Sequence, residues 1–282
     1  MKNPSPPPLF KKSPDSLPEM LRYLNLPASV ETYADVIAKA GKDNLSHEEF
    51  LKRFLSNESS AKFERQVKSR LATARFPTIK TLDTFDWNHP VSVPKAKILE
   101  AMELRFLEKS EGLVFIASHG LGKTHLATAL GHRAALAGVR TLFTKAVDMV
   151  THLAAAKPNH SHAKIMKLYT HPTLLIIDEL GRLSLDQQQG ELLFNVIDAR
   201  YERCSTVITT NRAFKDWGAI FRDMVCAKAI IDRLVHHSLC AATHKECYVV
   251  SPVMCCPSHS FDDRIFAGHH IIWTITGTEE RS

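Results

Sequence analysis

The residues of this 282-residue chain that could do chemistry gather first at a glycine-rich turn. Residues 117–124 read Ala-Ser-His-Gly-Leu-Gly-Lys-Thr, between an apolar run, LVFIA, and a helical stretch, HLATALGHRAALAG. Glycines allow backbone N–H groups to close around phosphate oxygens, and a helix N-terminus adds its positive dipole end. The spacing and context are typical of a Walker A loop in which Ala117 takes the usual first glycine position. The turn therefore predicts a nucleoside triphosphate site.

The side chains of this turn indicate which ligands it would bind. Lys123 would place an ammonium group between the β- and γ-phosphates, and the Thr124 hydroxyl could ligate a Mg²⁺ ion that bridges the same oxygens. We therefore expect ATP and Mg²⁺ as ligands. The residues predicted to contact the nucleotide are Ala117, Ser118, His119, Gly120, Leu121, Gly122, Lys123, Thr124 and His125.

An acidic strand end is the second feature with chemical potential. The run LLII is followed by Asp178 and Glu179, and buried charge at a strand end is costly unless a metal or partner compensates it. This pattern is typical of a Walker B motif. Asp178 would hold Mg²⁺, and Glu179 would orient or deprotonate a water molecule. We expect the glycine turn and this acidic tip to lie on adjacent strands, and the chemistry to be hydrolysis.

Two further residues could complete such a site. Asn211 follows the run STVITT, so its side chain could reach the γ-phosphate or the water from a neighbouring strand. Arg233 lies on a predicted helix, in a position from which it could enter the site of a neighbouring subunit. The predicted catalytic residues are Lys123, Glu179, Asn211 and Arg233.

The elements that must position these residues follow from periodicity. Short β-rich runs alternate with helical segments through the second two-thirds of the chain, which predicts an α/β fold with a parallel five-stranded sheet flanked by helices. The five runs are LVFIAS, RTLFTK, TLLIID, STVITT and SLCAAT. Residues 17–77 show helical periodicity and predict a small all-helical N-terminal domain.

Composition shifts divide the chain further. We predict a disordered tail over 1–16, which is rich in Pro, Ser and Lys, and a connector over 78–95, where Pro90 and Pro94, following Pro77, interrupt regular structure. The nucleotide-binding domain is expected over 96–250. A poorly ordered tail is expected over 251–282, because that segment lacks clean periodicity.

A basic segment lies near the end of the predicted helical domain. Between residues 60 and 80 basic residues outnumber acidic ones, and such a stretch is either a DNA-contacting surface or a solvated helix face. Both interpretations stay open from sequence. The candidates for contact with DNA phosphates are Lys62, Arg65, Lys68 and Arg70.

Bulk composition limits the class of protein. Hydrophobic residues make up 44% of the chain and charged residues 23%, which is ordinary for a globular protein. The formal net charge of +6 suits a polyanionic partner without demanding one. No apolar run reaches the roughly 18 residues needed to span a bilayer, and the start has no signal-peptide pattern. We therefore expect no membrane association and a cytoplasmic location.

Several strings resemble one family closely. GLGKTHLATALG, LLIIDELGRLSLD, LLFNVIDARYERCSTVITTNRAFKDWGAIFRD and AIIDRLVHHS, supported by ARFPTIKTLDTFDW, resemble the IstB-like ATP-binding proteins of insertion sequences, which are similar to DnaC-type helicase loaders. The resemblance covers roughly residues 17–250. It implies a P-loop AAA+ fold, ATP and Mg²⁺ as ligands, ATP-dependent homo-oligomers on double-stranded DNA, and stimulation of a partner transposase.

The resemblance also implies roles for two residues and shows departures from the family. Asn211 resembles a sensor 1 residue, and Arg233 resembles an arginine finger that acts across a subunit interface. Val249, in Cys-Tyr-Val, stands where the family's Ser-Tyr-Arg ending would supply a sensor 2 arginine, so weaker turnover is expected. The segment 251–282 resembles nothing in the family, and the short connection 157–162 replaces a longer one.

These observations predict a DNA-transposition helper ATPase that assembles on target DNA. Two alternatives stay open. A helicase loader of the DnaC type would bind a hexameric helicase and favour single-stranded DNA. An ATP-binding DNA scaffold would show little or no hydrolysis, as the uncharged Val249 would suit.

Overall fold

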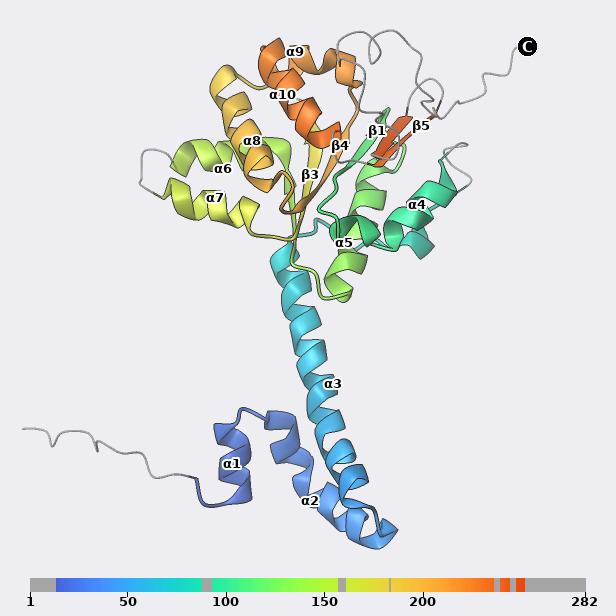
Figure 1. Cartoon of the computed structure of the whole chain (residues 1–282), viewed down its shortest axis with the longest axis vertical. Helices are drawn as coiled ribbons and strands as arrows, with labels where there is room; N and C mark the ends of the chain where they lie inside the picture. Colours follow the sequence, from blue (N-terminus) through green and yellow to red (C-terminus); the bar gives the residue numbers. More distant parts are fainter. Residues whose placement is uncertain are drawn as a thin grey trace, which may run out of the picture. The chain divides into compact units, whose positions relative to one another are not determined.

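A computed structural model describes residues 14–87, 93–156, 161–182, 184–235, 239–243 and 247–251. It divides into two compact units, Met1–Lys68 and Ser69–Ser282, with the boundary inside the long helix α3 (Figure 1). The domain limits expected from sequence at residues 16, 77, 95 and 250 stay predictions. Most of the two predicted tails lies outside the described residues.

Every regular element among the described residues of the first unit is a helix. Its elements are α1 (Leu17–Tyr23), α2 (Pro27–Asp43) and the first part of α3 (His47–Ala74). Ser16 and Glu19 form a capping box at α1, and the Glu49 N–H donates to Ser46 Oγ at 3.2 Å at the start of α3. The buried Glu58 joins two of these helices, because its carboxylate accepts from the Ser29 N–H at 2.9 Å.

The second unit is built on a sheet with the strand order β2-β3-β4-β1-β6-β5. The bounds of its strands are β1 Leu113–Ala117, β2 Thr141–Lys145, β3 Leu174–Leu180, β4 Ser205–Thr210, β5 Leu239–Thr243 and β6 Cys247–Ser251. The four strands β1 to β4 pair in parallel. Their carboxyl ends therefore meet at one edge of the sheet.

The prediction of a fifth parallel strand is wrong. Residues 239–243 form β5, which pairs antiparallel with β6, and β6 in turn pairs antiparallel with β1. The parallel part of the sheet therefore has four strands. The reason is the length of the connection: only residues 244–246 separate β5 from β6, which suits a hairpin, whereas parallel neighbours need a crossover of roughly a dozen residues.

Helices cover both faces of the parallel strands (Figure 1). Besides the 3₁₀ turns η1 (Leu82–Thr84), η2 (Arg105–Leu107) and η3 (Phe214–Asp216), the helices are α4 (Lys95–Met102), α5 (Lys123–Leu136), α6 (Ala146–Ala156), α7 (His162–Thr170), α8 (Gln187–Arg200), α9 (Trp217–Phe221) and α10 (Met224–Val235). Alternate strand residues point to opposite faces. On β1, Val114 and Ile116 face the cluster under α6 to α10, whereas Leu113 and Phe115 face the cluster under α4 and α5. Burial on both faces explains why β1 is apolar without interruption.

Candidate functional site

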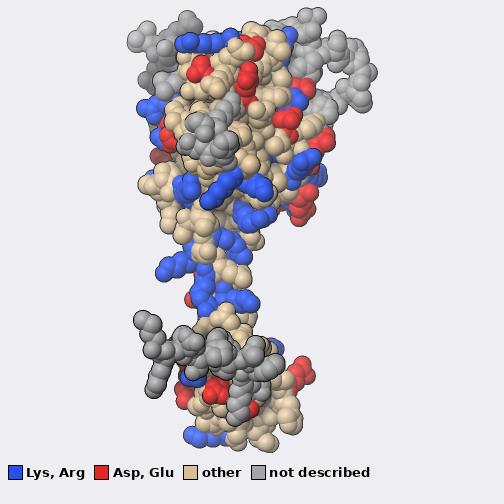
Figure 2. Space-filling view, turned by 90° about the vertical axis from the view of Figure 1, so that its left-hand side faces the viewer, with Lys and Arg blue, Asp and Glu red and all other residues tan. Residues whose placement is uncertain are grey.

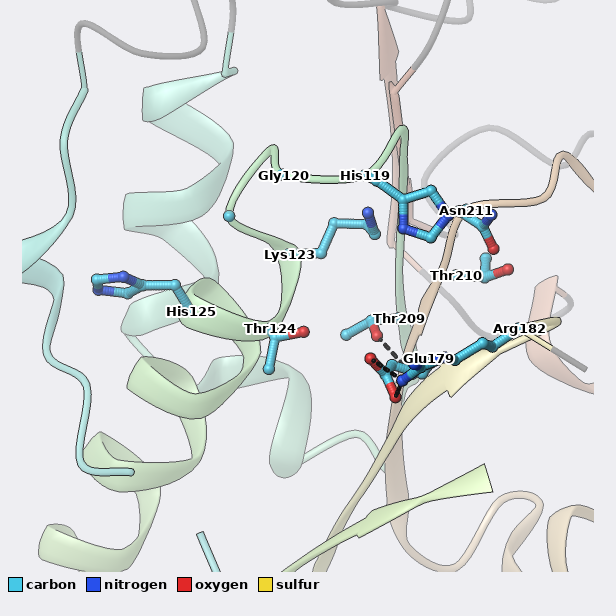
Figure 3. A pocket seen from close by; sticks show the side chains of 11 residues that line it. His119, Gly120, Lys123, Thr124, His125, Glu179, Arg182, Thr209, Thr210 and Asn211 are labelled. Atoms are coloured by element: carbon cyan, nitrogen blue, oxygen red, sulfur yellow. Dashed lines mark hydrogen bonds and ion pairs between the residues drawn. The ribbon is translucent and has the colours of Figure 1, made fainter. Parts of the chain in front are cut away.

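The carboxyl ends of three parallel strands bring the predicted nucleotide-binding residues to one cavity. The glycine turn follows β1, the acidic pair ends β3, and Asn211 follows β4. The expectation that the turn and the acidic tip lie on adjacent strands is wrong, because β4 pairs with both β1 and β3 and lies between them. The cavity has a volume of about 260 Å³ (Figure 3). It is lined by His119, Gly120, Gly122, Lys123, Thr124, His125, Glu179, Arg182, Thr209, Thr210 and Asn211.

The turn between β1 and α5 has the conformation that its glycines permit. Gly120 and Gly122 have φ values of 79° and 76°, in the left-handed region where a side chain is strained. The Phe85 ring also packs so closely that a Cβ on Gly122 would lie 2.6 Å from Phe85 Cε2. Lys123 Nζ donates to the Ser118 carbonyl at 2.7 Å and points into the cavity (Figure 3).

Not all nine residues predicted to contact the nucleotide line the cavity. His119, Gly120, Gly122, Lys123, Thr124 and His125 do. Ala117 is the buried last residue of β1, and Ser118 and Leu121 lie between it and α5 without lining the cavity. His125 Nε2 also lies 2.9 Å from the Thr81 carbonyl, so the segment before α4 packs against the start of α5.

The predicted metal ligands converge. Thr124 Oγ1 donates to Asp178 Oδ1 at 2.9 Å and lies 3.2 Å from Oδ2. Thr209 Oγ1, from the intervening strand β4, also donates to Asp178 Oδ1. Asp178 is only 2% exposed. Thr124 lines the cavity, whereas Asp178 is not among the lining residues and lies directly behind Thr124. A hydroxyl and a carboxylate are hard oxygen donors, so this pair fits the preference of Mg²⁺.

Glu179 has an unusual backbone and two cationic partners. Its φ is 57°, where the β3–β4 register shifts between Ile177 and Leu180, and its N–H donates to Thr209 Oγ1 at 3.0 Å. Lys145 Nζ lies 3.1 Å from Glu179 Oε2, and Arg182 Nη1 lies 3.1 and 2.9 Å from Oε1 and Oε2. Burial alone would raise the pKa of the Glu179 carboxyl, but these two cations outweigh it and lower the pKa.

Asn211 and Arg233 lie in different surroundings. Asn211 lines the cavity, and its Nδ2 lies 2.9 Å from His119 Nε2 (Figure 3). Arg233, on α10, is not among the lining residues. Its Nε lies 2.6 Å from Asp198 Oδ1, and its guanidinium stacks over the Phe194 ring at 4.6 Å. Within one chain, therefore, the structure unites three of the four predicted catalytic residues and leaves Arg233 outside.

Sequence reasoning missed four residues at or beside the site, namely Lys145, Arg182, Thr209 and Thr210. Thr209 lies in a strand that was predicted, two positions before Asn211, so the strand-end argument could have included it. Arg182 is three residues after Glu179, and a charged residue so close to the acidic pair was a usable signal. Lys145 ends β2, and only its pairing opposite Asp178 places it beside Glu179. That pairing has no signal in the local sequence.

The candidate DNA-binding residues lie on the second half of α3. Figure 2 shows Lys and Arg side chains gathered along this helix. Lys62, Arg65 and Lys68 are exposed, and Arg70 is half-buried beside Gly138. Arg65 also has a structural role, because its guanidinium pairs with the buried Glu58 at 2.8 Å.

The remaining expectations concern membrane-spanning segments, the sensor 2 position and two segments with unusual sequence. No helix among the described residues is long and apolar enough to cross a membrane. Val249 lies in β6 opposite Phe115 of β1, so the position expected for a sensor 2 arginine is part of a strand pair. The predicted short connection at 157–162 lies mostly outside the described residues, as does the segment 252–282.

Comparison with known proteins places the chain in a family. The model of the "IstB-like ATP binding protein" family matches residues 19–251. The ATP-binding protein of insertion sequence IS5376 from Geobacillus stearothermophilus is 38% identical over 221 residues, which cover 78% of this chain and 88% of the relative. The ATP-binding protein of insertion sequence IS21 from Pseudomonas aeruginosa is 37% identical over 203 residues, which cover 72% of this chain and 77% of the relative.

Two solved structures resemble this chain over about half of its length. The DnaC helicase loader aligns with 28% identity and a TM-score of 0.46, over 54% of this chain and 92% of that one. DnaI aligns with 20% identity and a TM-score of 0.49, over 55% of this chain and 86% of the DnaI chain. The parallel strands β1 to β4, with a glycine turn between β1 and α5, have the strand–turn–helix arrangement of a P-loop domain. With its family model matched over residues 19–251, the chain belongs to the IstB-like ATP-binding proteins.

Proposed function

We propose that this protein hydrolyses ATP to ADP and phosphate and acts as a helper of DNA transposition, assembling on double-stranded DNA and stimulating a partner transposase. The observation that carries the hydrolysis is the convergence of Lys123, Thr124, Asp178, Glu179 and Asn211 at the ends of three parallel strands. Such a set supplies a phosphate-binding cation and a candidate base in one cavity, with metal ligands at Thr124 in the cavity wall and Asp178 behind it.

The binding step follows from the turn and the helix behind it. The left-handed glycines turn the backbone at the N-terminus of α5, an arrangement in which backbone N–H groups can donate to phosphate oxygens. Lys123 adds a full positive charge, and Mg²⁺ held by Thr124 and Asp178 would neutralise charge on the bound phosphates. The Mg²⁺ ion is part of the proposal, supported by the oxygen donor pair described above.

The hydrolysis step requires an activated water molecule. The water oxygen forms a bond to the γ-phosphorus, the bond from that phosphorus to the bridging oxygen of ADP breaks, and Glu179 accepts the proton of the water. Asn211 orients the water or contacts the γ-phosphate. Arg233 of a neighbouring subunit supplies a further cation in the transition state, so turnover depends on the homo-oligomer.

The role in transposition is supported by the relatives. Curated relatives that cover more than two thirds of this chain are ATP-binding proteins of insertion sequences. The exposed Lys62 and Lys68 on α3 offer contacts for phosphates of duplex DNA.

An ATP-binding scaffold without turnover is the second candidate function. The observation that favours it is the Glu179 carboxylate, which is engaged by Lys145 and Arg182.

Phosphate release measured with and without duplex DNA separates the two candidates. A helper ATPase predicts DNA-stimulated release that disappears in Lys123→Ala and in Glu179→Gln, with ATP binding lost in the first variant and kept in the second. Lys109→Ala, at an exposed lysine outside the cavity, is the matched control and should behave as the wild type. Wild-type protein that binds ATP and DNA but releases no phosphate would leave only the scaffold.

A DNA-preference experiment separates the helper from a helicase loader. We expect tighter binding of duplex than of single-stranded DNA, and a salt dependence whose slope falls by about 0.9 for each phosphate contact removed. Lys62→Ala and Lys68→Ala should each lower this slope, whereas Lys52→Ala, near the start of the same helix, should not. A clear preference for single-stranded DNA would contradict the transposition helper and favour the loader.

A further inference from the structure

Arg182 is a cation of the cavity to which the proposed reaction assigns no role. It follows β3 directly after Gly181, its side chain is 61% exposed, and it lines the cavity together with Lys123 and Thr124. Figure 3 shows its guanidinium end lying against the Glu179 carboxylate. Its Nη1 reaches both carboxylate oxygens, at 3.1 and 2.9 Å.

The two cations on Glu179 differ in one respect. Lys145 also pairs with Glu179, at 3.1 Å, but it comes from the end of β2 and is not among the residues that line the cavity. Arg182 is therefore the partner of Glu179 that a bound nucleotide could contact. While both cations are in place, both carboxylate oxygens are engaged, and the carboxylate is poorly placed to accept a proton from water.

A terminal phosphate is a stronger partner for Arg182 than the carboxylate is. It carries more negative charge than Glu179 and presents oxygens that match the planar fork of a guanidinium. ADP ends at its β-phosphate and has no γ-phosphate, so a contact between Arg182 and a γ-phosphate is specific to a triphosphate. The exchange needs little rearrangement of the backbone, since the Glu179 N–H stays bonded to Thr209 Oγ1 and only side chains must rotate.

We propose that Arg182 distinguishes ATP from ADP by leaving Glu179 for the terminal phosphate of a bound nucleoside triphosphate. The exchange has two results. It adds a contact that ADP cannot make, and it frees a carboxylate oxygen of Glu179 to act on water. This inference rests on the proposed ATP hydrolysis at the same site, and it makes Arg182 the residue through which nucleotide type controls the catalytic carboxylate.

Nucleotide affinity measured by calorimetry on the full chain, with Mg²⁺ present, tests the contact. The probes are ADP and AMPPCP, a triphosphate analogue that is not hydrolysed. Arg182→Ala should weaken AMPPCP binding by about tenfold and change ADP binding by less than about twofold, because one charge-assisted contact is lost. Arg182→Lys should restore part of the difference. Arg105→Ala, at an exposed arginine paired with Glu103, is the matched control and should retain both affinities.

A double-mutant cycle tests the exchange itself. Glu179→Gln should tighten AMPPCP binding when Arg182 is present, because the competing carboxylate charge is gone, and should have little effect in the Arg182→Ala background. Simple removal of repulsion between Glu179 and phosphate predicts the same tightening in both backgrounds, and that result would overturn the proposal. Lys145→Ala should leave the preference for AMPPCP over ADP in place.

The outcomes for Arg182 and for the ATPase itself are distinct. Equal loss of ADP and AMPPCP binding in Arg182→Ala would show a structural role and contradict the proposal. Wild-type protein that binds neither nucleotide would contradict the proposed function. Because Arg182 is exposed, the variant should keep the wild-type circular dichroism spectrum, which separates loss of contact from loss of folding.

Discussion

At the scale of single residues, polar contacts link the strand ends around the cavity. Asp178 receives hydroxyl hydrogen bonds from two other elements, Thr124 on α5 and Thr209 on β4. Asn211 contacts His119 of the glycine turn, and since an amide nitrogen can only donate, His119 Nε2 is the acceptor. These contacts join β1, β3, β4 and α5 at the edge where a triphosphate would bind.

Asn211→Ala should lower kcat for ATP hydrolysis by roughly a hundredfold while changing KM little. The physical reason is that the amide would act on the water or the γ-phosphate during the reaction, and one such donor has an effect of this order. His119→Ala, which removes the partner of the amide in the structure, should affect KM more than kcat. Steady-state phosphate release checks both variants. An unchanged kcat in Asn211→Ala would contradict the sensor role.

At the scale of elements, the start of α5 is packed against the segment before α4. His125 meets the Thr81 carbonyl at 2.9 Å, and the Phe85 ring lies edge-on to the His125 ring at 5.3 Å between centroids. Phe85 also occupies the space beside Gly122. The conformation of the glycine turn therefore depends on residues that precede it by about 40 positions as well as on its own sequence.

Gly122→Ala should destabilise the second unit by about 2 kcal/mol or more, because it adds a left-handed alanine and a clash with Phe85. Gly41→Ala is a matched control, since Gly41 lies inside α2 with nothing within 4 Å of its added Cβ, and the control should be stabilising by up to about 1 kcal/mol. Urea unfolding of both variants measures the free energies. Equal effects would contradict the packing argument.

In the helical unit, Glu58 makes stability depend on pH. Burial alone would raise the pKa of this carboxyl, but the Ser29 N–H and Arg65 outweigh it, so the pKa falls below its ordinary value of 4.5. A lowered native pKa stabilises the fold above the unfolded pKa, and this stability is lost as the pH falls through the native pKa. Glu58→Gln should therefore destabilise the unit at neutral pH.

The loss in the free energy of unfolding caused by Glu58→Gln should shrink at acid pH, where the wild-type carboxyl is protonated in both the folded and the unfolded state. Urea unfolding followed by circular dichroism, at neutral pH and at about pH 3, measures it. Glu64→Gln, at an exposed position of the same helix, is the control and should cost little at either pH. A cost that is independent of pH would show that lost packing, rather than lost charge, explains the destabilisation.

At the scale of the whole molecule, one chain does not complete the proposed site. Arg233 lies on α10 outside the cavity, where Asp198 binds its Nε at 2.6 Å and the Phe194 ring lies under its guanidinium. To act in catalysis it must reach the cavity of another subunit. The proposed hydrolysis therefore requires the proposed oligomer, whereas within one chain the ion pair with Asp198 holds Arg233 outside the cavity.

Mixing two inactive variants tests action between subunits. Arg233→Ala has an intact cavity without the arginine, and Lys123→Ala supplies the arginine without a working cavity. Each alone should lose nearly all hydrolysis, whereas an equal mixture should recover about a quarter of the wild-type rate, since one interface in four joins an intact cavity to an intact arginine. Absence of recovery in mixed oligomers would contradict the role across the interface.

The sequence alone determined the local features of this protein. The glycine turn, the helix behind it and the acidic strand end are each encoded within a few residues, because turn conformation and the periodicity of apolar residues are local properties. The same reasoning predicted the parallel strands β1 to β4, the helices on both faces and the helical N-terminal unit. The family resemblance came from the same contiguous strings.

Tertiary structure alone decided which distant residues meet. Strand order placed β4 between the glycine turn and the acidic tip and so brought Thr209 to Asp178, and the pairing of β2 with β3 brought Lys145 to Glu179. The antiparallel pairing of β5 and β6 replaced the expected fifth parallel strand. Strand pairing joins segments far apart in the chain, and it depends on which arrangement buries the most apolar surface, a property of the whole domain that no local stretch specifies.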